Sequence, residues 1–550
     1  MKKPAISDDY IVYLQESDFD IRPKDDPTSF SQAMSDSNST LWYDAMKEEM
    51  ESMAKNQVWD LVELPKEVIA IGCKWVYKTK RNASGNIERY KARLVAKGFT
   101  QKEGIDYHET FSPVSKKDLF RIIMALVAHF DLELHQMDVK MAFLNGDLEE
   151  PVYMVQPQGF YDDKDSHLVC KLKKSIYGLK QASRQWYIKF HNVIASYGFV
   201  KSIVDQCIYL KVSGSKYIFL VLYVDDTLLA SSDLGLLHET KQFLSQNFEM
   251  KDLGEALYVI GIEIHRDRSQ RLLGLSQKAY IEKVLKIFGM KDCAPTVAPI
   301  MKGDKFSKNQ CPQNELEREQ MKNIPYASAI GSLMYAQVCT RPDIGFIVGL
   351  LGRYQSNPGL DHWKAAKKVM RYLQGTKDYK LTYRHTNQLK VIGYLDSDFA
   401  RCVDTRKSTS GYIFLLSGGA ISWRSTKQKL VASSTMEAEF VACYEATTQA
   451  LWLRNFIIGL KIVDSISRPL KIFCDNSVAI FFSKNNKSGS RSKHIDIKYL
   501  KVRENVKKQK VSIEHISTKL MIVNPMTKGL STKPYKDHVE HMGLNNLFDV

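Results

Sequence analysis

The sequence predicts an α+β fold followed by a smaller α/β domain, because predicted strands and helices occur together in both parts of the chain. In each part, predicted strands end in acidic residues. The run from Tyr217 to Val224 is apolar, β-branched and aromatic, which is typical of a buried strand. A second short apolar run follows two acids, so the pair predicts a hairpin. In the last third, a strand ending in Asp396, a helix carrying Glu439 and a strand ending in Asp475 follow one another. This alternation indicates an α/β domain.

Composition and charge set consistent bounds. At 550 residues the chain is long enough for roughly two to four domains. With 44% hydrophobic and 25% charged residues it is globular in composition, and the net charge of +16 favours a polyanionic partner. The nine cysteines include no Cys-x-x-Cys pair, so neither a disulfide framework nor a zinc module is indicated. No apolar run is long enough to cross a bilayer, and an acidic stretch follows the basic N-terminus where a signal core would stand.

The first elements are predicted from composition and period. Residues 1–40 are polar, with acids and prolines, and predict a flexible leader. An amphipathic helix is expected over 41–53, with Thr40 as a candidate N-cap. Residues 68–98 predict a hairpin with a turn at 82–85.

Later elements follow the same signals. Residues 253–264 alternate and predict a strand pair, and 276–289 have helical spacing. Prolines and polar residues predict a linker that begins at about 293, and a helical segment is expected over 326–376. Strands are expected in the last third over 391–396, 408–416, 420–424 and 471–475.

Tyr223-Val-Asp-Asp226 places two carboxylates at the tip of the predicted buried hairpin. Adjacent carboxylates there are costly to desolvate unless a cation shares their charge, whereas the bland alternative is an ordinary acidic turn. Asp138 also follows a short apolar-rich segment. Together with Asp225 and Asp226 it forms a set that suits two Mg²⁺ ions bound with the help of substrate phosphates. Such a pair activates a primer hydroxyl and stabilises leaving pyrophosphate, which is polymerase chemistry.

Several further segments stand in one specific order. They are Tyr90-Lys-Ala-Arg-Leu-Val-Ala-Lys-Gly98, Glu109-Thr-Phe-Ser-Pro-Val114, the Asp138 segment, Ser175-Ile-Tyr-Gly-Leu-Lys-Gln181, Tyr223-Val-Asp-Asp226, Ser332-Leu-Met-Tyr335, Arg341-Pro-Asp-Ile344 and Ser408-Thr-Ser-Gly-Tyr412. With them the chain resembles the reverse transcriptase–ribonuclease H portion of a copia-like LTR retrotransposon Pol polyprotein. The resemblance runs from about Trp59 to near the C-terminus.

The resemblance implies a polymerase right hand of fingers and palm, followed by an α/β ribonuclease H-like domain. It implies an RNA-directed DNA polymerase with a ribonuclease H that cleaves RNA in RNA–DNA hybrids. Each active site is expected to use two Mg²⁺ ions, with Mn²⁺ as an alternative. The expected domains are a flexible leader (1–40), fingers and palm (41–292), a linker (293–325), a helical connection (326–388), the ribonuclease H-like domain (389–535) and a tail (536–550).

In the polymerase part the resemblance assigns the metal-binding catalytic acids to Asp138, Asp225 and Asp226. Lys78, Lys80 and Arg93 are basic residues of the fingers hairpin, as is Lys91, and suit the incoming triphosphate; Arg93 is the strongest candidate. For any single one of them a solvated strand face is the alternative.

Three more residues are expected to contact the nucleotide. Phe143 stands at the position of the reverse-transcriptase steric gate, where a large ring would crowd a ribose 2′-OH; a core residue is the alternative. Tyr177 and Gly178 suit a backbone that approaches nucleotide and template closely. Residues 253–264 correspond to the primer grip, which holds the primer 3′ end near the metals.

In the ribonuclease H-like part the expected catalytic metal ligands are Asp396, Glu439 and Asp475. Glu437 is the alternative to Glu439, since helix phase decides which of the two points inward. Members of the family usually carry Ala-Asp-Pro-Leu-Thr-Lys near the end, and this chain has Val523-Asn-Pro-Met-Thr-Lys528. Asn524 therefore replaces the fourth carboxylate, which predicts a weakened second metal and impaired RNA cleavage; Asp496 is a less favoured substitute.

The implied partners are an RNA template, a DNA primer, the RNA–DNA hybrid and deoxynucleoside triphosphates, with no membrane. The implied location is the cytoplasm, within virus-like particles, with the nucleus as a second site. One alternative function is a decayed or domesticated copy that binds nucleic acid without catalysis. A ribonuclease H with an idle polymerase half is the weakest reading, because its acidic set is the altered one.

Overall fold

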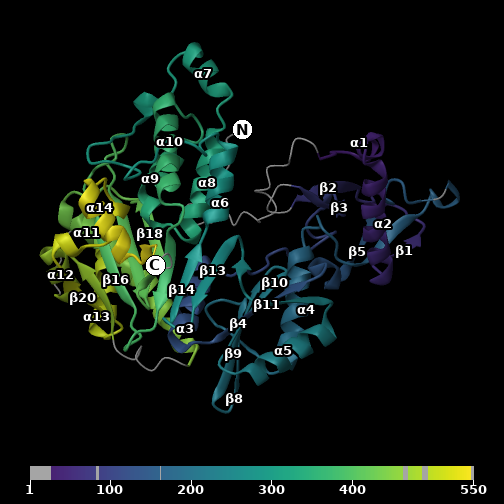
Figure 1. The fold of residues 1–550 in the computed structure, drawn as a ribbon, viewed down its shortest axis with the longest axis horizontal. Coiled ribbons are helices and arrows are strands. Elements are labelled where there is room, and N and C mark those ends of the chain that lie inside the picture. Colours follow the sequence, from purple (N-terminus) through teal and green to yellow (C-terminus); the bar gives the residue numbers. More distant parts are fainter. Residues whose placement is uncertain (1–25, 82–85, 162, 462–468, 486–492, 547–550) are drawn as a thin grey trace.

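The computed structural model describes residues 26–81, 86–161, 163–461, 469–485 and 493–546. In Figure 1 the N-terminal part, in purple, lies at one end of the molecule and the C-terminal part, in yellow, at the other. Strands from the middle of the chain, in teal, lie between them. None of the helices in the described ranges is both long and apolar enough to cross a membrane.

A hairpin and a small sheet form the N-terminal part. β2 (Cys73–Arg81) pairs antiparallel with β3 (Ile87–Ala96), which confirms the predicted hairpin. The predicted helix is α2 (Ser39–Lys55), and its Trp42 packs edge-on against Tyr77 of β2 in the core of this part. The small sheet has the strand order β1 (Trp59–Val62), β6 (Val169–Lys174), β5 (Asp147–Met154).

The flexible leader is wrong for residues 26–40. α1 (Phe30–Ser35) lies within it, and Asp26 is buried where it accepts a 2.9 Å hydrogen bond from the Thr79 hydroxyl of β2. This contact fixes the segment onto the hairpin, which no local pattern indicates. Thr40 is not an N-cap, because α2 already begins at Ser39. Residues 1–25 lie outside the described ranges.

A six-stranded antiparallel sheet forms the middle of the molecule. Its strand order is β11 (Met250–Glu255), β4 (Glu133–Val139), β10 (Asp226–Ser231), β9 (Lys216–Tyr223), β8 (Ile208–Ser213), β7 (Val200–Lys201). Successive residues of β9 enter different cores: Phe219 packs with α3 (Lys117–Phe130), and Leu220 packs with α4 (Ala182–Ser196) and α5 (Leu234–Asn247). Since side chains alternate across a strand, both faces of this sheet are covered, as the continuous apolar run predicts.

A five-stranded sheet follows and joins distant parts of the chain. Its order is β12 (Tyr258–Val259), β13 (Ile262–Asp267), β14 (Leu272–Ser276), β15 (Lys380–Arg384), β21 (Leu544–Asn545). The strands β12 and β13 confirm the predicted pair. Residues 536–541 belong to a helix, and β21 pairs with β15, so the expected tail over 536–550 is wrong for these residues.

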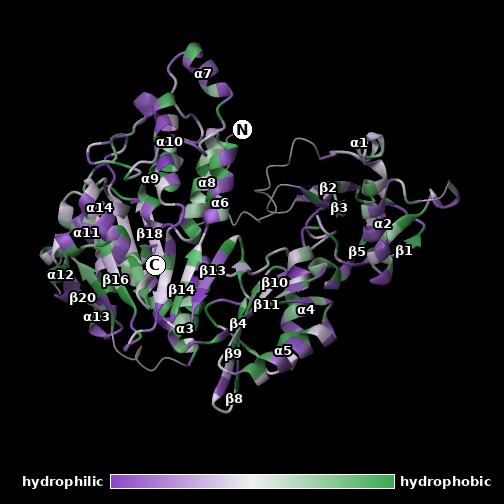
Figure 2. Cartoon of the chain, in the orientation of Figure 1, coloured by the Kyte–Doolittle hydropathy of each residue, from purple (hydrophilic) through white to green (hydrophobic). Residues whose placement is uncertain are grey.

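Helices continue this region. They are α6 (Lys278–Ile287), α7 (Glu315–Lys322), α8 (Tyr326–Cys339), α9 (Gly345–Leu351) and α10 (Leu360–Gly375). The predicted helix over 276–289 and the helical segment from 326 are confirmed. The expected linker contains α7, on which only Met321 is buried; Figure 2 shows this helix as largely hydrophilic at the edge of the molecule.

The C-terminal part contains a mixed five-stranded sheet. Its order is β18 (Gly419–Lys427), β17 (Thr409–Leu416), β16 (Ile392–Ser397), β19 (Leu470–Cys474), β20 (Val511–His515), with β16, β19 and β20 parallel and the others antiparallel. The helices are α11 (Thr435–Gly459), α12 (Ser477–Lys484), α13 (Lys493–Lys507) and α14 (Thr532–His541). The predicted α/β character and the predicted strands are confirmed.

One hydrophobic core runs from the middle sheet into the C-terminal part. It contains Phe120 of α3, Leu333 of α8 and Ile421 of β18 among many others. α3 packs against β14, β15 and β18. The helix α3, which precedes β4, therefore packs against both the middle sheet and the C-terminal part.

Candidate active sites

The first acidic set lies where β4 and β10 run side by side. Asp138 and Asp226 are register partners across these antiparallel strands. Asp225 occupies the turn between β9 and β10, where its carbonyl oxygen accepts a 3.0 Å hydrogen bond from the backbone N–H of Val139. The buried hairpin and the neighbouring strand thus bring the three predicted acids to one edge of the sheet.

The turn that carries Asp225 is strained. Val224 has a φ of 60°, a left-handed conformation in which a β-branched residue is an outlier. The indole N–H of Trp186, on α4, donates a 2.6 Å hydrogen bond to the Val224 carbonyl oxygen. Strain of about 1–3 kcal/mol at such a turn persists only where the surroundings hold it, and it is typical of functional sites.

The electrostatics of this edge favour a bound cation. Burial raises the pKa of the Asp138 carboxyl, and the nearby Asp225 raises it further, whereas Lys91, Lys251 and Arg93 lower it. Asp226 accepts a 2.8 Å hydrogen bond from the Gln136 side-chain amide. Carboxylate oxygens are ligands that Mg²⁺ prefers, and a bound cation would offset the repulsion between neighbouring carboxylates. This set therefore fits a hard divalent cation.

Three of the predicted nucleotide-contacting residues form one cluster beside these acids. The Arg93 guanidinium lies 4.9 Å from the ring centroid of Tyr177. The rings of Tyr177 and Phe143 meet edge-on with centroids 5.0 Å apart. Burial raises the pKa of the Tyr177 hydroxyl to about 12, and among its charged neighbours Arg93 lowers it while Asp225 and Asp138 raise it. The β2–β3 hairpin therefore places the Arg93 guanidinium over the Tyr177 ring, near Asp138 and Asp225.

Lys78 and Lys80 lie on β2, the strand that pairs with the Arg93 strand β3. Lys78 is the register partner of Lys91. Burial lowers the pKa of Lys78 to about 8, and the neighbouring cations Lys80 and Lys283 lower it further. Basic side chains are thus crowded here, which suits a polyanion.

Gly178 lies against the backbone of β3. It has a φ of 93°, and a Cβ there would overlap the carbonyl oxygen of Ala96 on β3. The Tyr177 carbonyl oxygen accepts a 2.8 Å hydrogen bond from the Ala96 N–H. Gly178 therefore lets this backbone pack closely against β3. The approach of the same backbone to a nucleotide and template stays a prediction.

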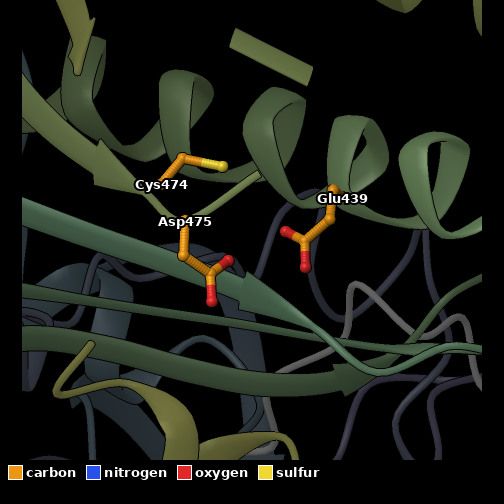
Figure 3. A group of neighbouring side chains, drawn as sticks. All are labelled: Glu439, Cys474 and Asp475. Carbon is orange, nitrogen blue, oxygen red and sulfur yellow. The ribbon is translucent and has the colours of Figure 1, made fainter. Parts of the chain in front are cut away.

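The second acidic set lies at one edge of the C-terminal sheet. Asp396 is near the end of β16, Asp475 follows β19, and Glu439 comes from the first turns of α11. Because parallel strands end at the same edge, β16 and β19 place both aspartates there. Figure 3 shows the Glu439 and Asp475 carboxylates directed into the same space; together with the Cys474 thiol they offer atoms within 4.8 Å of one another.

Asp396 and Glu439 are buried, and Asp475 is half-buried. Burial raises the pKa of Glu439 well above its usual range, and Asp396, Cys474 and Asp475 raise it further. One Glu439 oxygen accepts a 3.1 Å hydrogen bond from the Ser397 N–H, and the other, Oε2, is buried with no partner among the described residues. An orphaned carboxylate oxygen facing two more carboxylates fits a divalent cation.

Two residues of this site were missed by sequence reasoning. The Lys528 ammonium lies 3.2 Å from Oδ2 of Asp396, and the Thr527 hydroxyl donates to the same oxygen. Burial raises the pKa of Asp396, and Lys528 opposes it. The signal was the Thr-Lys pair that ends the Val523–Lys528 segment.

Glu437 is occupied at the start of α11. Its Oε2 accepts hydrogen bonds from the backbone N–H and the hydroxyl of Ser433, at 2.8 and 2.7 Å, while its own N–H donates to the Ser434 hydroxyl. This carboxylate serves the helix N-terminus. Glu439, two residues on, is the one that faces Asp475.

Asn524 lies in a short 3₁₀ turn directly before Thr527. Its amide N–H donates a 3.0 Å hydrogen bond to the Thr518 carbonyl oxygen, and its Oδ1 is buried without a partner in the described part of the chain. The side chain of Asp496 lies outside the described residues.

Comparison with known proteins shows which family the chain resembles. A family model described as reverse transcriptase (RNA-dependent DNA polymerase) matches residues 56–302. The chain is 45% identical, over 95% of its length, to the retrovirus-related Pol polyprotein from transposon TNT 1-94 of Nicotiana tabacum, and covers 39% of it. It is 36% identical, over 95% of its length, to the Pol polyprotein from transposon RE1 of Arabidopsis thaliana, and covers 35% of that protein.

A shorter relative is matched along its whole length. The putative transposon Ty5-1 protein of Saccharomyces cerevisiae is 32% identical over 57% of this chain, which covers 100% of it. Among solved structures, the foamy viral protease-reverse transcriptase in complex with dsDNA is similar with a TM-score of 0.48 and 11% identity, over 87% of this chain and 83% of that one. The chain thus spans between a third and two fifths of the two long relatives.

Proposed function

Since the chain belongs to the copia-like family of retrotransposon Pol polyproteins, whose reverse transcriptase portion it matches, we propose that it is an RNA-directed DNA polymerase. The observation that carries this proposal is the convergence of Asp138, Asp225 and Asp226 on one edge of the middle sheet. The Arg93–Tyr177–Phe143 cluster lies beside that edge. A carboxylate set faced by a cation over an aromatic floor suits a deoxynucleoside triphosphate on a primed template.

The three carboxylates would hold two Mg²⁺ ions, or Mn²⁺ as an alternative, which activate the primer hydroxyl and stabilise leaving pyrophosphate. Arg93 and Lys91 offset the charge of the triphosphate, with Lys78 and Lys80 adding to the positive field. Phe143, held edge-on by Tyr177, crowds the ribose 2′ position and favours deoxynucleotides. Trp186 keeps the strained Val224 turn, and hence Asp225, in place.

The C-terminal domain is proposed to cleave RNA in RNA–DNA hybrids with reduced efficiency. Asp396, Glu439 and Asp475 would hold its Mg²⁺ ions, which activate water and stabilise the leaving oxygen. Lys528 and Thr527 orient the Asp396 carboxylate. Asn524 offers a neutral oxygen in place of a charged one, which weakens the hold on the second ion.

The test is Mg²⁺-dependent primer extension on an RNA template. Wild-type protein is compared with a double variant, Asp225→Asn and Asp226→Asn. A matched control carries Asp60→Asn and Asp147→Asn, whose exposed carboxylates pair with Lys173 and Lys189 on the surface. Extension by wild type and control, with none by the site variant, is the expected result.

No extension by a folded wild-type sample that still binds the hybrid would overturn the polymerase and favour the binding-only alternative. Binding of the hybrid, measured by titration, should weaken strongly as salt rises, because Lys and Arg contacts to phosphates release counterions.

A further inference from the structure

A two-residue turn joins β12 and β13, and both of its residues are left-handed. Ile260 has a φ of 52° and Gly261 a φ of 68°. Turns of this kind favour Asn-Gly, because both residues need a positive φ. Isoleucine is β-branched and is an outlier there, so the turn needs an external hold.

That hold comes from a helix more than sixty residues further along the chain. The Tyr335 hydroxyl, on α8, donates a 2.8 Å hydrogen bond to the Ile260 carbonyl oxygen. The Tyr335 ring packs on Tyr280 of α6, with centroids 4.9 Å apart. The hydroxyl is thus directed by a packed ring onto the strained turn.

The same region contacts the catalytic hairpin. The ammonium of Lys117, a buried lysine of α3, lies 4.4 Å from the Tyr223 ring centroid and 5.8 Å from that of Tyr335. Tyr223 is the register partner of Asp226 across the hairpin. A small cavity of about 10 Å³ is lined by Tyr223, Asp226 and Ile260, among others. The turn therefore rests against the strands that present the catalytic carboxylates.

We propose that Tyr335 is a positioning residue of the polymerase site, whose hydroxyl sets the Ile260–Gly261 turn, and through it the primer 3′ end, relative to Asp226. The proposal rests on the proposed function and on the expectation that residues 253–264, which include this turn, hold the primer 3′ end. It also gives a role to the segment Ser332-Leu-Met-Tyr335, which has no part in the proposed binding of the metals or the nucleotide. Reaction rates are sensitive to small displacements of a reacting group, so a lost hydrogen bond at the turn reaches the chemistry.

Tyr335→Phe removes the hydroxyl and keeps the ring between Lys117 and Tyr280. The matched control is Tyr280→Phe, which removes a similar hydrogen bond, 3.1 Å from the Tyr280 hydroxyl to the Ser332 carbonyl oxygen, that does not involve the turn. In single-nucleotide extension we expect Tyr335→Phe to lower kcat about five- to tenfold, with the KM for the nucleotide changed less than about twofold. Tyr280→Phe should leave kcat within about twofold of wild type.

A second readout does not depend on turnover. A primer with 2-aminopurine at its 3′ end is bound as a primer–template duplex, and its emission reports the stacking of that base. Tyr335→Phe should change the emission of the bound duplex, and Tyr280→Phe should match wild type. Lys117→Met should change it in the same direction as Tyr335→Phe, while Lys117→Arg, which keeps a cation between the rings, should restore it.

Equal kcat and equal emission for wild type, Tyr335→Phe and Tyr280→Phe would overturn the proposal. Equal losses of kcat in the two variants would also overturn it, because they would indicate a purely structural hydrogen bond. If wild-type protein does not extend a primer at all, the proposed function fails, and the emission of the bound duplex still decides whether Tyr335 positions its 3′ end.

Discussion

The Arg121 guanidinium, on α3 beside the six-stranded middle sheet, donates a 2.8 Å hydrogen bond to the carbonyl oxygen of Ile421, on β18 of the C-terminal part. The same side chain donates to the carbonyl oxygens of Val338 and Cys339 at the end of α8, and pairs with Asp118. It is only 2% exposed. One buried cation therefore joins α3, the end of α8 and β18, which are three separate parts of the chain.

Replacing this cation should loosen both domains. Arg121→Leu removes the cation paired with Asp118 and the donor to three carbonyl oxygens, so we expect a loss of about 3–5 kcal/mol in the free energy of unfolding. Arg268→Leu is the control, because the Arg268 pair with Glu133 is 43% exposed on the arginine side and should cost less than about 1 kcal/mol. Urea unfolding of both variants measures the difference, and similar losses would contradict a role for Arg121 as the joining residue.

Phe143 should govern sugar selection. Phe143→Val removes the ring that meets Tyr177, so ribonucleotide incorporation relative to deoxynucleotide incorporation should rise about ten- to a hundredfold. The measurement is the ratio of kcat/KM for a matched rNTP and dNTP. Phe160→Val, an aromatic of the fingers that packs on Trp75 instead, is the control. An unchanged ratio in Phe143→Val would identify Phe143 as core packing.

Asn524→Asp should strengthen the ribonuclease site. The new carboxylate replaces an amide whose Oδ1 has no described partner, so Mg²⁺ affinity and RNA cleavage should rise about tenfold or more. Cleavage of a labelled RNA–DNA hybrid and calorimetric Mg²⁺ titration measure both effects. The control is Asn505→Asp, a buried asparagine of α13 whose amide donates to the Lys501 carbonyl oxygen.

A stability measurement checks the same change without turnover. In EDTA, Asn524→Asp should melt below wild type, because it loses the hydrogen bond to Thr518 and adds a buried charge. Mg²⁺ should raise its melting temperature more than that of wild type. No gain in cleavage and no larger Mg²⁺ effect would remove the case that Asn524 impairs this site.

His362 should make stability depend on pH. Its Nδ1 accepts a 3.0 Å hydrogen bond from the Gly359 N–H at the start of α10, and its ring stacks on Tyr354 with centroids 4.1 Å apart. Burial lowers the pKa of His362 below its usual value near 6.5, against the opposing effect of Asp361, Asp404 and the Ser307 backbone. The folded state therefore disfavours the proton, so this stability is fully present above about pH 6.5 and is lost as pH falls below it.

His362→Gln keeps an acceptor for the Gly359 N–H and removes the titrating group. Its melting temperature should fall less between pH 7.5 and 5.5, values that bracket roughly the ordinary histidine range, than that of wild type. His541→Gln, an exposed histidine of α14, should behave as wild type does. A fall in His362→Gln as steep as in wild type would show that other groups carry the acid dependence.

The sequence by itself determined most helices and strands and the acidic residues of both candidate sites. The buried run before Asp225, the helix carrying Glu439 and the strand ending in Asp475 were predictable, because strand and helix periods are local properties of neighbouring residues. The order of motifs likewise placed Arg93, Tyr177 and Phe143 in one site, and the structure brings these side chains together.

Only the tertiary structure decided what depends on residues far apart in the chain. It assigned Glu437 to the helix N-terminus and Glu439 to the acids, and showed that Gly178 packs closely against Ala96 of β3. It folded residues 26–40 and the C-terminal strand β21 onto distant partners. Contacts such as Arg121 with Ile421 join segments separated by some 300 residues, and no local pattern encodes them, because they form only when separate hydrophobic faces pack into one core.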